Sequence, residues 1–356
     1  MRIALDAMGS DAGATPLVEG AILAAKRFAI PVVLAGKQHT LRRLLRHFRY
    51  EGGLIDIEPC TEVVRMGEHP RDSLAKRDSS VAVAARLVQE KRADAMVSAG
   101  NSGSTLAHAM TCWRRLKGIS RPGIATLMPT RKGSCLVMDV GANVDCKPRH
   151  LVDFALMGSI YMREIMGRPK PRVGVLSVGE EPSKGNALTL ATHRLLQTSH
   201  LNFIGNVQGN DLFKGVADVV VCDGFVGNVL LKTSEGVAKM IMTGIKGAMT
   251  KNVLAMVGAL MVSPGMRSFK KKIDYSEYGG APLLGLNGVC IITHGAADSK
   301  AVMNAIRAAA EAVNHQVNRS IAEEVRQITE EIKDVSAEIE EEEARQQHRP
   351  VAAVAP

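Results

Sequence analysis

Short apolar runs alternate with segments of helical periodicity along most of the chain. Strand-length runs are expected at residues 2–8, 31–36, 55–60, 93–99, 123–129, 134–140, 172–178, 203–207, 217–223 and 288–294. Helical segments are expected between them, at residues 15–28, 79–91, 103–117, 149–166, 186–197 and 226–249. Several runs, such as residues 219–222, are apolar at every position, which is typical of parallel strands covered on both faces. The alternation predicts a doubly wound α/β sandwich whose ligands bind beyond the carboxyl ends of its strands.

A turn of small polar residues follows the apolar run at 93–99 and opens the next helix. Its members are Gly100, Asn101, Ser102, Gly103, Ser104 and Thr105. Two glycines allow a ligand to approach the backbone closely, and short donors stand beside the free N–H groups of a helix start. We interpret the turn as a phosphate or oxyanion cradle. The alternative is an ordinary capped strand-to-helix turn, which uses the same residue types.

Glycine-bearing polar loops follow five further strands, at residues 6–11, 139–148, 179–186, 223–228 and 294–298. We expect them to meet the 100–105 turn at one edge of the sheet, where they line a cleft of small donors, acids and one lysine. A polar segment at residues 68–80 offers His69 and Arg71, which suit an anionic ligand if they face this cleft. The alternative for these two residues is a solvated loop.

Residues 253–262 form ten continuous apolar positions, and Arg267, Lys270, Lys271 and Lys272 follow shortly after. The stretch is too short to span a bilayer. It fits a helix lying on an anionic membrane surface with its basic flank on the headgroups. It fits a dimer interface or a buried core helix equally well. Beyond residue 300 an apolar stripe predicts an amphipathic helix that packs on the body, continues as an acidic extension over 320–349 and ends in a disordered tail at 350–356.

The net charge of +9 is unevenly distributed: residues 320–349 carry −6, which leaves +15 for the rest. The surplus gathers at residues 37–46, 113–117 and 267–272, and it favours an acidic partner. Aromatic residues are only 3% and no nucleic-acid-binding motif is present, so no nucleic-acid partner is expected. Six scattered cysteines without a CxxC pair indicate a reducing, cytoplasmic setting.

Several common motifs are missing from the sequence. There is no GxGxxG after the first strand, no Walker A loop, no GxSxG elbow and no HExxH pair. Asp139, Asp145 and Asp223 could bind Mg²⁺ together, but capping and turn duties are commoner for Asp beside Gly, so neither a metal nor a cofactor is expected. Cys146 is the one cysteine that is a candidate nucleophile, and the sequence shows no general base for it.

The loop motifs together resemble the bacterial phosphate acyltransferase family, in the family's order from residue 1 to about residue 310. The matching stretches are LDAMG at 5–9, SAGNSG at 98–103, DVGAN at 139–143, GEE at 179–181 with KGN at 184–186, CDGFVGN at 222–228 and YGGAPLLG at 278–285. The resemblance implies a three-layer α/β/α sandwich similar to isopropylmalate dehydrogenase and phosphotransacetylase, with a mostly parallel sheet. It implies an acyltransferase domain at 1–319, from which a helical segment at 225–280 protrudes for dimer or membrane contact.

The resemblance also implies an activity: transfer of a long-chain acyl group from acyl carrier protein to inorganic phosphate, which feeds phospholipid synthesis. We expect the 100–105 turn to hold phosphate, Lys184 to supply positive charge, and Asn186 or Asn228 to donate to the thioester carbonyl. The remaining candidate substrate-binding residues are Asp6, Gly9, His69, Arg71, Asp139, Asn143, Asp145, Asp223, Gly224, Phe225, Gly227 and His294.

Several partners follow from the same resemblance. They are acyl carrier protein, a second copy of the chain, an anionic membrane surface contacted peripherally from the cytoplasm, and a downstream glycerol-3-phosphate acyltransferase. The basic cluster that docks the carrier, whether around Arg42 or around Arg114 and Arg115, stays open. Three rival functions stay open as well: a phosphotransacetylase that uses coenzyme A, a metal-dependent hydroxyacid dehydrogenase, and a membrane scaffold without enzymatic activity.

Overall fold

The structure of the protein is a computed structural model that describes residues 1–273 and 279–347, with side chains described except at 253–254, 267–273, 343 and 345–347. The strands in this part of the chain are β1 (Ile3–Asp6), β2 (Val32–Gly36), β3 (Ile55–Pro59), β4 (Ala95–Ser98), β5 (Gly123–Thr130), β6 (Gly133–Met138), β7 (Val173–Leu176), β8 (Phe203–Val207), β9 (Val219–Val221), β10 (Ala281–Leu284) and β11 (Val289–Ile292). The helices are α1 (Ala14–Phe28), α2 (Gln38–His47), α3 (Pro70–Ser73), α4 (Ser80–Gln89), α5 (Ser102–Trp113), α6 (Pro148–Glu164), α7 (Ala187–Gln197), α8 (Gly209–Leu212), α9 (Gly224–Met249), α10 (Val253–Ile273), α11 (Ser299–Asn314), α12 (Val317–Glu331) and α13 (Lys333–Gln347).

The N-terminal half of the sheet is parallel, in the order β3-β2-β1-β4-β11. Strands β1 and β4 are buried on both faces, as their largely apolar sequences predict. Leu5 packs into the core beneath α1 and α11, whereas Ala4 points to the opposite face, which α4 and α5 cover. The strands of the first βα units are therefore covered by helices on both faces, as the sequence predicts.

Strands β10 and β5 reverse the direction of the sheet. β10 is antiparallel to β11 and to β5, and β5 is antiparallel to β6, so the parallel set β6-β9-β7-β8 runs opposite to the N-terminal set. The expectation that all the polar loops leave one common edge is therefore wrong. The loops after β1, β4 and β11 leave in one direction, and those after β6, β9 and β7 leave in the other.

The register nevertheless brings the two sets of loops near one another. Leu283 of β10 pairs with Cys290 of β11 and with Ile124 of β5, and Cys290 pairs with Met96 of β4. Ile124 in turn donates its N–H to the carboxylate of Asp139, directly after β6. The end of β6 therefore lies level with Met96, two residues before the end of β4. The two half-sheets overlap by only a few residues, so their carboxyl ends meet across β10 and β5.

Helices cover both faces of the sheet, which confirms the predicted three-layer sandwich. On one face, α6, α7 and α12 enclose Leu136 and Met138 of β6. Val137, between them, points to the other face and joins the cluster that includes α4 and α5. The core is aliphatic, and Tyr161 and Phe154 of α6 are its largest fully buried side chains.

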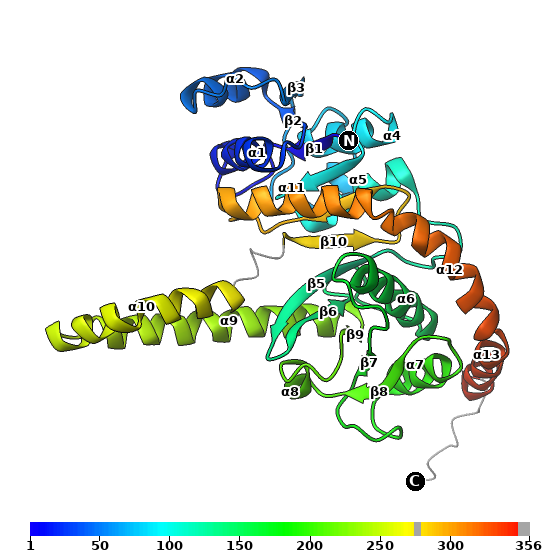
Figure 1. Ribbon diagram of the computed structural model, residues 1–356. Helices are drawn as coiled ribbons and strands as arrows, with labels where there is room; N and C mark the ends of the chain where they lie inside the picture. The colour runs from blue at the N-terminus through cyan, green and yellow to red at the C-terminus, as the bar shows by residue number, and fades with distance from the viewer. Residues whose placement is uncertain (274–278, 348–356) are drawn as a thin grey trace, which may run out of the picture.

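Helices α9 and α10 lie side by side and project from the body (Figure 1). This arm is the protruding helical segment that the resemblance implies. No helix in residues 1–273 or 279–347 combines the length and hydropathy needed to cross a membrane. The basic flank at 267–272 and the segment at 274–278 lie outside the residues whose side chains are described.

The helices at the C-terminus pack along the second half of the sheet. α12 lies on α6, where Val325 and Ile328 belong to the buried core (Figure 1). α13 continues toward α7, and Arg194 of α7 forms ion pairs with Glu338 and Glu342. Part of the acidic extension thus lies against the body. The tail at 348–356 lies outside the described residues.

Candidate functional site

The turn after β4 is held in shape by hydrogen bonds to β1. Ser98 donates its hydroxyl to the Asp6 carboxylate at 2.8 Å and accepts from the Gly100 N–H and the Thr105 hydroxyl. Gly9 lies directly against Gly100: a Cβ at Gly9 would be 3.0 Å from the Gly100 Cα and 2.6 Å from an Asp6 oxygen. Asp6 and Gly9 therefore shape the loop from beneath it.

Asn101 ties this turn to the segment before α3. Its side-chain oxygen caps α5 by accepting from the Ser104 N–H, and its amide nitrogen donates to the carbonyls of Met66 and Glu68, at 2.6 and 3.1 Å. The side-chain amide is thus fully engaged within the protein. In this structure Asn101 positions the turn.

The remaining polar residues of the turn divide into one exposed and two buried side chains. Ser102 is exposed at the helix start, and its N–H and that of Gly103 have no acceptor within the helix. Ser104 and Thr105 are each 1% exposed, and the Ser104 hydroxyl has no hydrogen-bond partner among the described residues. The N–H groups of Ser102 and Gly103 and the Ser102 hydroxyl are therefore the groups a bound anion would reach first.

The loops after β1, β4 and β11 make up the first of two groups of loops, and the loop after β11 is bonded to the loop after β1. The Ser10 hydroxyl donates to the Gly295 carbonyl at 2.6 Å, and the Asp11 N–H donates to the same oxygen. His294, the residue before Gly295, is exposed and accepts the Ala296 N–H at its Nδ1. The loops after β1, β4 and β11 thus form one hydrogen-bonded unit.

The second group of loops is built around the buried Asp139. Its carboxylate accepts the backbone N–H groups of Ile124, Gly141, Ala142 and Asn143 and the side-chain amide of Asn143. Burial raises the pKa of the Asp139 carboxyl, and these donors oppose that rise. Asp139 and Asn143 therefore fix the loop backbone, with Asp139 fully enclosed.

The first turn of α9 rests on this loop. Asp223 caps the helix by accepting the Val226 N–H, and the Gly224 N–H donates to the Asn143 carbonyl at 2.7 Å. A Cβ at Gly227 would lie 1.8 Å from the Asp139 carbonyl oxygen, so no other residue fits there without a shift. The contact leaves Phe225 61% exposed and places Asn228 beside Gly141.

A cavity of about 940 Å³ joins the two groups of loops. Ser102 and His294 line it from the first group, and Gly141 and Asn228 from the second. Strand β5 and helix α9 supply most of its remaining wall, which is largely apolar: Ile124, Leu127, Met128, Pro129, Leu231, Ala238, Ile241 and Met242. Sequence reasoning missed these wall residues. The signal it could have used is the run at 228–242, where apolar residues recur at helical spacing.

The loop after β7 does not line this cavity. Lys184 is exposed, and its carbonyl accepts from the Ser177 hydroxyl and the Asn206 amide. Asn186 caps α7 by accepting the Thr189 N–H. Neither residue is among those that line the cavity. The roles expected of them remain predictions.

Three other candidates lie on exposed loops. His69 accepts the Arg71 N–H at the start of α3, and the side chains of both residues are exposed, as is that of Asp145. Among the described residues no three His, Cys, Asp or Glu side chains gather closely enough to hold a metal ion. For Cys146, burial and the nearby Asp139 raise the thiol pKa to about 12, which argues against a nucleophilic thiolate.

Comparisons with known proteins agree with this architecture. A family model described as "Fatty acid synthesis protein" matches residues 1–320. Proteins named phosphate acyltransferase from Geobacter sulfurreducens and Syntrophotalea carbinolica are each 49% identical to this chain, over 91% and 89% of it and over 94% and 91% of their own lengths.

Solved structures extend the likeness to the fold. A phosphotransacetylase from Streptococcus pyogenes matches with a TM-score of 0.59 at 18% identity, over 88% of this chain and 94% of its own. A putative 4-hydroxythreonine-4-phosphate dehydrogenase from Salmonella typhimurium matches with a TM-score of 0.52 at 16% identity, over 87% and 98%. At these identities the likeness concerns the fold alone.

Proposed function

The chain belongs to the phosphate acyltransferase family and is an acyltransferase; from this premise we propose that it transfers a long-chain acyl group from acyl carrier protein to inorganic phosphate. The product, an acyl phosphate, would serve phospholipid synthesis. Both substrates must then meet at one place, a thioester carbonyl facing a phosphate oxygen.

The observation that carries the proposal is the cavity between the two groups of loops. Its volume lies near the upper end of the range of about 300–1,000 Å³ that small-molecule sites occupy. Its lining includes Ser102, His294 and Asn228 from the loops, and its wall of β5 and α9 residues is mostly apolar, with Lys232 and Glu235 among the exceptions. Polar loop residues suit phosphate and a thioester, whereas a long apolar wall suits a fatty acyl chain and has no use for an acetyl group.

The proposed chemistry requires positioning more than a strong base. Phosphate is largely a dianion near neutral pH and attacks the carbonyl carbon directly; the carbon–sulfur bond then breaks, and the carrier leaves as a thiolate that takes a proton from water. In our proposal the N–H groups of Ser102 and Gly103, in the turn at 100–105, hold phosphate, and Lys184 supplies positive charge to the approaching anion. No covalent intermediate on the protein is needed.

Asn228 is the stronger of the two candidates for stabilising the carbonyl oxygen. It lines the cavity, whereas the side chain of Asn186 already caps α7. A donor aimed at the oxyanion typically contributes about 10²-fold to turnover. Asn228→Ala is therefore expected to lower kcat by about that factor.

The exposed apolar face of α10 supports a further part of the proposal. Leu260 and Met261 are 75% and 80% exposed, and Met256, Val257 and Val262 lie near them. Such a face favours burial against another surface. We propose that it contacts an anionic bilayer on the cytoplasmic side, a second copy of the chain, or both, where the product reaches a downstream glycerol-3-phosphate acyltransferase.

The proposal is tested by supplying phosphate with either palmitoyl-acyl carrier protein or acetyl-coenzyme A and trapping acyl phosphate as hydroxamate. We expect product from the carrier substrate and little from acetyl-coenzyme A. Because Lys184 lies outside the cavity and acts only through its charge, we expect a smaller loss in Lys184→Ala than in Asn228→Ala. Product from acetyl-coenzyme A alone would favour the phosphotransacetylase function. Equal product from wild type and Lys184→Ala would support the activity but show that Lys184 has no part in it.

A further inference from the structure

Helix α2 presents a strongly basic outer face. Its apolar residues follow helical spacing, and Leu41 is buried in the core while Leu44, Leu45 and Phe48 pack against it. The helix also carries Arg42, Arg43 and Arg46, all three of which are exposed. From residue 37 to residue 50 the sequence holds five Lys or Arg residues and no Asp or Glu. The helix thus separates an anchoring face from a cationic one.

These cations have no acidic partner among the described residues. The ion pairs within that part of the chain engage other arginines, such as Arg92 with Glu58 and Arg172 with Asp218, but none of them includes an arginine of α2. Like charges held close on one face repel one another, and an opposing partner surface would relieve that repulsion. The face is therefore electrostatically prepared for an acidic partner.

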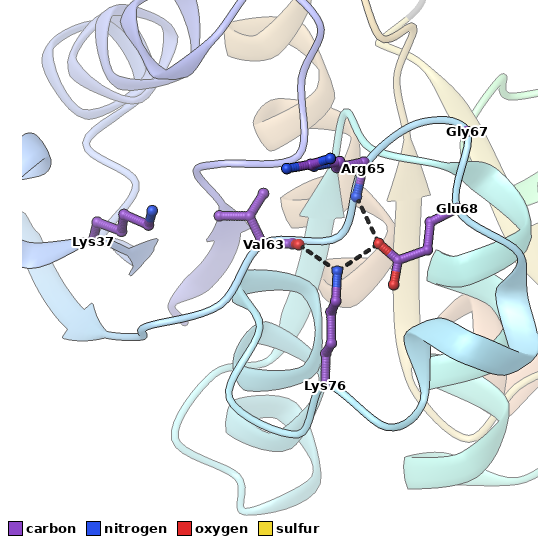
Figure 2. Close-up of a pocket in the computed structure, with 6 residues that line it drawn as sticks. All are labelled: Lys37, Val63, Arg65, Gly67, Glu68 and Lys76. Carbon is purple, nitrogen blue, oxygen red and sulfur yellow. Dashed lines mark hydrogen bonds and ion pairs between the residues drawn. The ribbon is translucent and has the colours of Figure 1, made fainter.

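A basic cavity of about 610 Å³ adjoins the start of this helix (Figure 2). Lys37, which precedes α2, and Arg65 line it from separate segments, and no ion pair includes either of them in the part of the chain that the structure describes. Lys76 also lines it, with its ammonium donating to Glu68 at 2.6 Å and to the Val63 carbonyl at 3.1 Å. With Glu68 paired to Lys76, the positive charges of Lys37 and Arg65 remain for an anion.

The cavity lies close to the turn at 100–105. Lys37 directly follows β2, which stands two strands from β4 in the sheet, a lateral distance of about 10 Å. The segment that lines the cavity is bonded to the turn, because Asn101 donates to the carbonyls of Met66 and Glu68. Only the segment at 66–68 thus separates a group bound in the cavity from the proposed phosphate site.

We propose that α2 and the cavity at its N-terminus form the docking surface for the acyl donor. This inference rests on the proposed function, in which the donor is a small acidic protein bearing its acyl chain on a phosphodiester-linked thiol arm. The carboxylates of that protein face Arg42, Arg43 and Arg46, and the phosphodiester at the base of the arm enters the cavity between Lys37 and Arg65. The arm then runs toward the turn at 100–105 and delivers the thioester to the larger cavity.

The second basic cluster, Arg114, Arg115 and Lys117, fits this partner less well. It stands at the carboxyl end of α5, about 18 Å along the helix from the turn at 102. Arg115 already donates to the Ser120 carbonyl, and the residues that line the two cavities described above come from other segments. Because it offers the same number of cations, it provides a matched control.

The kinetic test compares the triple variant Arg42→Glu/Arg43→Glu/Arg46→Glu with Arg114→Glu/Arg115→Glu/Lys117→Glu. For the α2 variant we expect KM for acyl carrier protein to rise about 10-fold or more, with kcat and the KM for phosphate within about twofold of wild type. The control variant should change KM for the carrier by less than about twofold, and added salt should weaken the wild-type interaction. Equal changes in both variants, or no change in the α2 variant, would overturn the docking surface.

A binding test separates the cavity from the helix and does not depend on activity. Calorimetry with carrier protein carrying its phosphodiester-linked arm should show weaker binding to Lys37→Ala/Arg65→Ala, by about 10-fold, whereas carrier without the arm should bind wild type and variant alike. Equal losses of affinity with both carrier forms would show that the phosphodiester does not bind in the cavity. Binding of the carrier without acyl transfer would contradict the proposed function and leave the docking surface intact; no binding to wild type would overturn the docking surface itself.

Discussion

The contact between the first turn of α9 and the loop at 139–143 predicts opposite effects for two identical substitutions in one helix. In Gly227→Ala the new Cβ would lie 1.8 Å from the Asp139 carbonyl oxygen, 2.9 Å from its carbon and 3.0 Å from the Cys222 sulfur. Ordinary contact begins at 3.4 Å, so the shortfall is about 1.6 Å against the backbone oxygen alone. The helix must move away from the loop.

The magnitude follows from what that movement disrupts. Overpacking a rigid site costs about 1–3 kcal/mol. The displacement also strains the 2.7 Å hydrogen bond from the Gly224 N–H to Asn143, worth about 1 kcal/mol. We therefore expect Gly227→Ala to lower the free energy of unfolding by about 2–4 kcal/mol and, because α9 forms a cavity wall, to lower kcat/KM by about 10²-fold.

Gly236→Ala is the matched control in the same helix. Nothing lies within 4 Å of the place that a Cβ would occupy there, so the change gains up to about 1 kcal/mol of helix propensity and leaves activity unaltered. Urea unfolding followed by circular dichroism, together with acyl phosphate formation, measures both variants. If Gly227→Ala matched Gly236→Ala in stability and rate, the contact between α9 and the 139–143 loop would have no role in shaping the site.

Three further predictions concern the cavity, the C-terminal helices and pH. Leu231→Trp fills the apolar cavity, so kcat/KM should fall at least about 10-fold for a palmitoyl donor and much less for a short-chain donor, as measured by hydroxamate assays across chain lengths. Ile328→Ala removes a fully buried side chain where α12 packs, and urea unfolding should show a loss of about 2–5 kcal/mol; no loss would mean that α12 is not docked. Burial lowers the pKa of His108, whose ring contacts the Ser73 carbonyl. Because the unfolded chain then binds a proton that the folded chain rejects, stability should fall as pH drops below 6.5, and the slope should be smaller in His108→Gln.

The local pattern of the chain predicted most of the fold because each buried parallel strand carries its own apolar signal. The ten expected strands correspond to observed ones, with ends that differ by a few residues. β10 was missed because its four residues follow two glycines and include Pro282, which hides the strand signal. α2 was treated only as a basic cluster, although the spacing of Leu41, Leu44, Leu45 and Phe48 indicates a helix.

The reversal of the sheet had no local signal at all. Strand direction depends on how β10 and β5 pair, and pairing is a long-range property that neither strand encodes alone. For the same reason the local motifs identified most of the loops that line the cavity but not the way in which those loops meet. They also pointed to ligand binding by residues that the structure engages internally, such as Asn101 and Asp139, because the residue types that bind anions also build turns.

In the function proposed for this protein, phosphate itself attacks the carrier-bound thioester in the cavity between the two groups of loops. The most direct test supplies palmitoyl-acyl carrier protein with phosphate labelled at all its oxygens with ¹⁸O and measures the mass of the product. We expect palmitoyl phosphate that retains every labelled oxygen and forms only when phosphate is present. Palmitate released without phosphate dependence, or no consumption of the thioester under any condition, would contradict this mechanism.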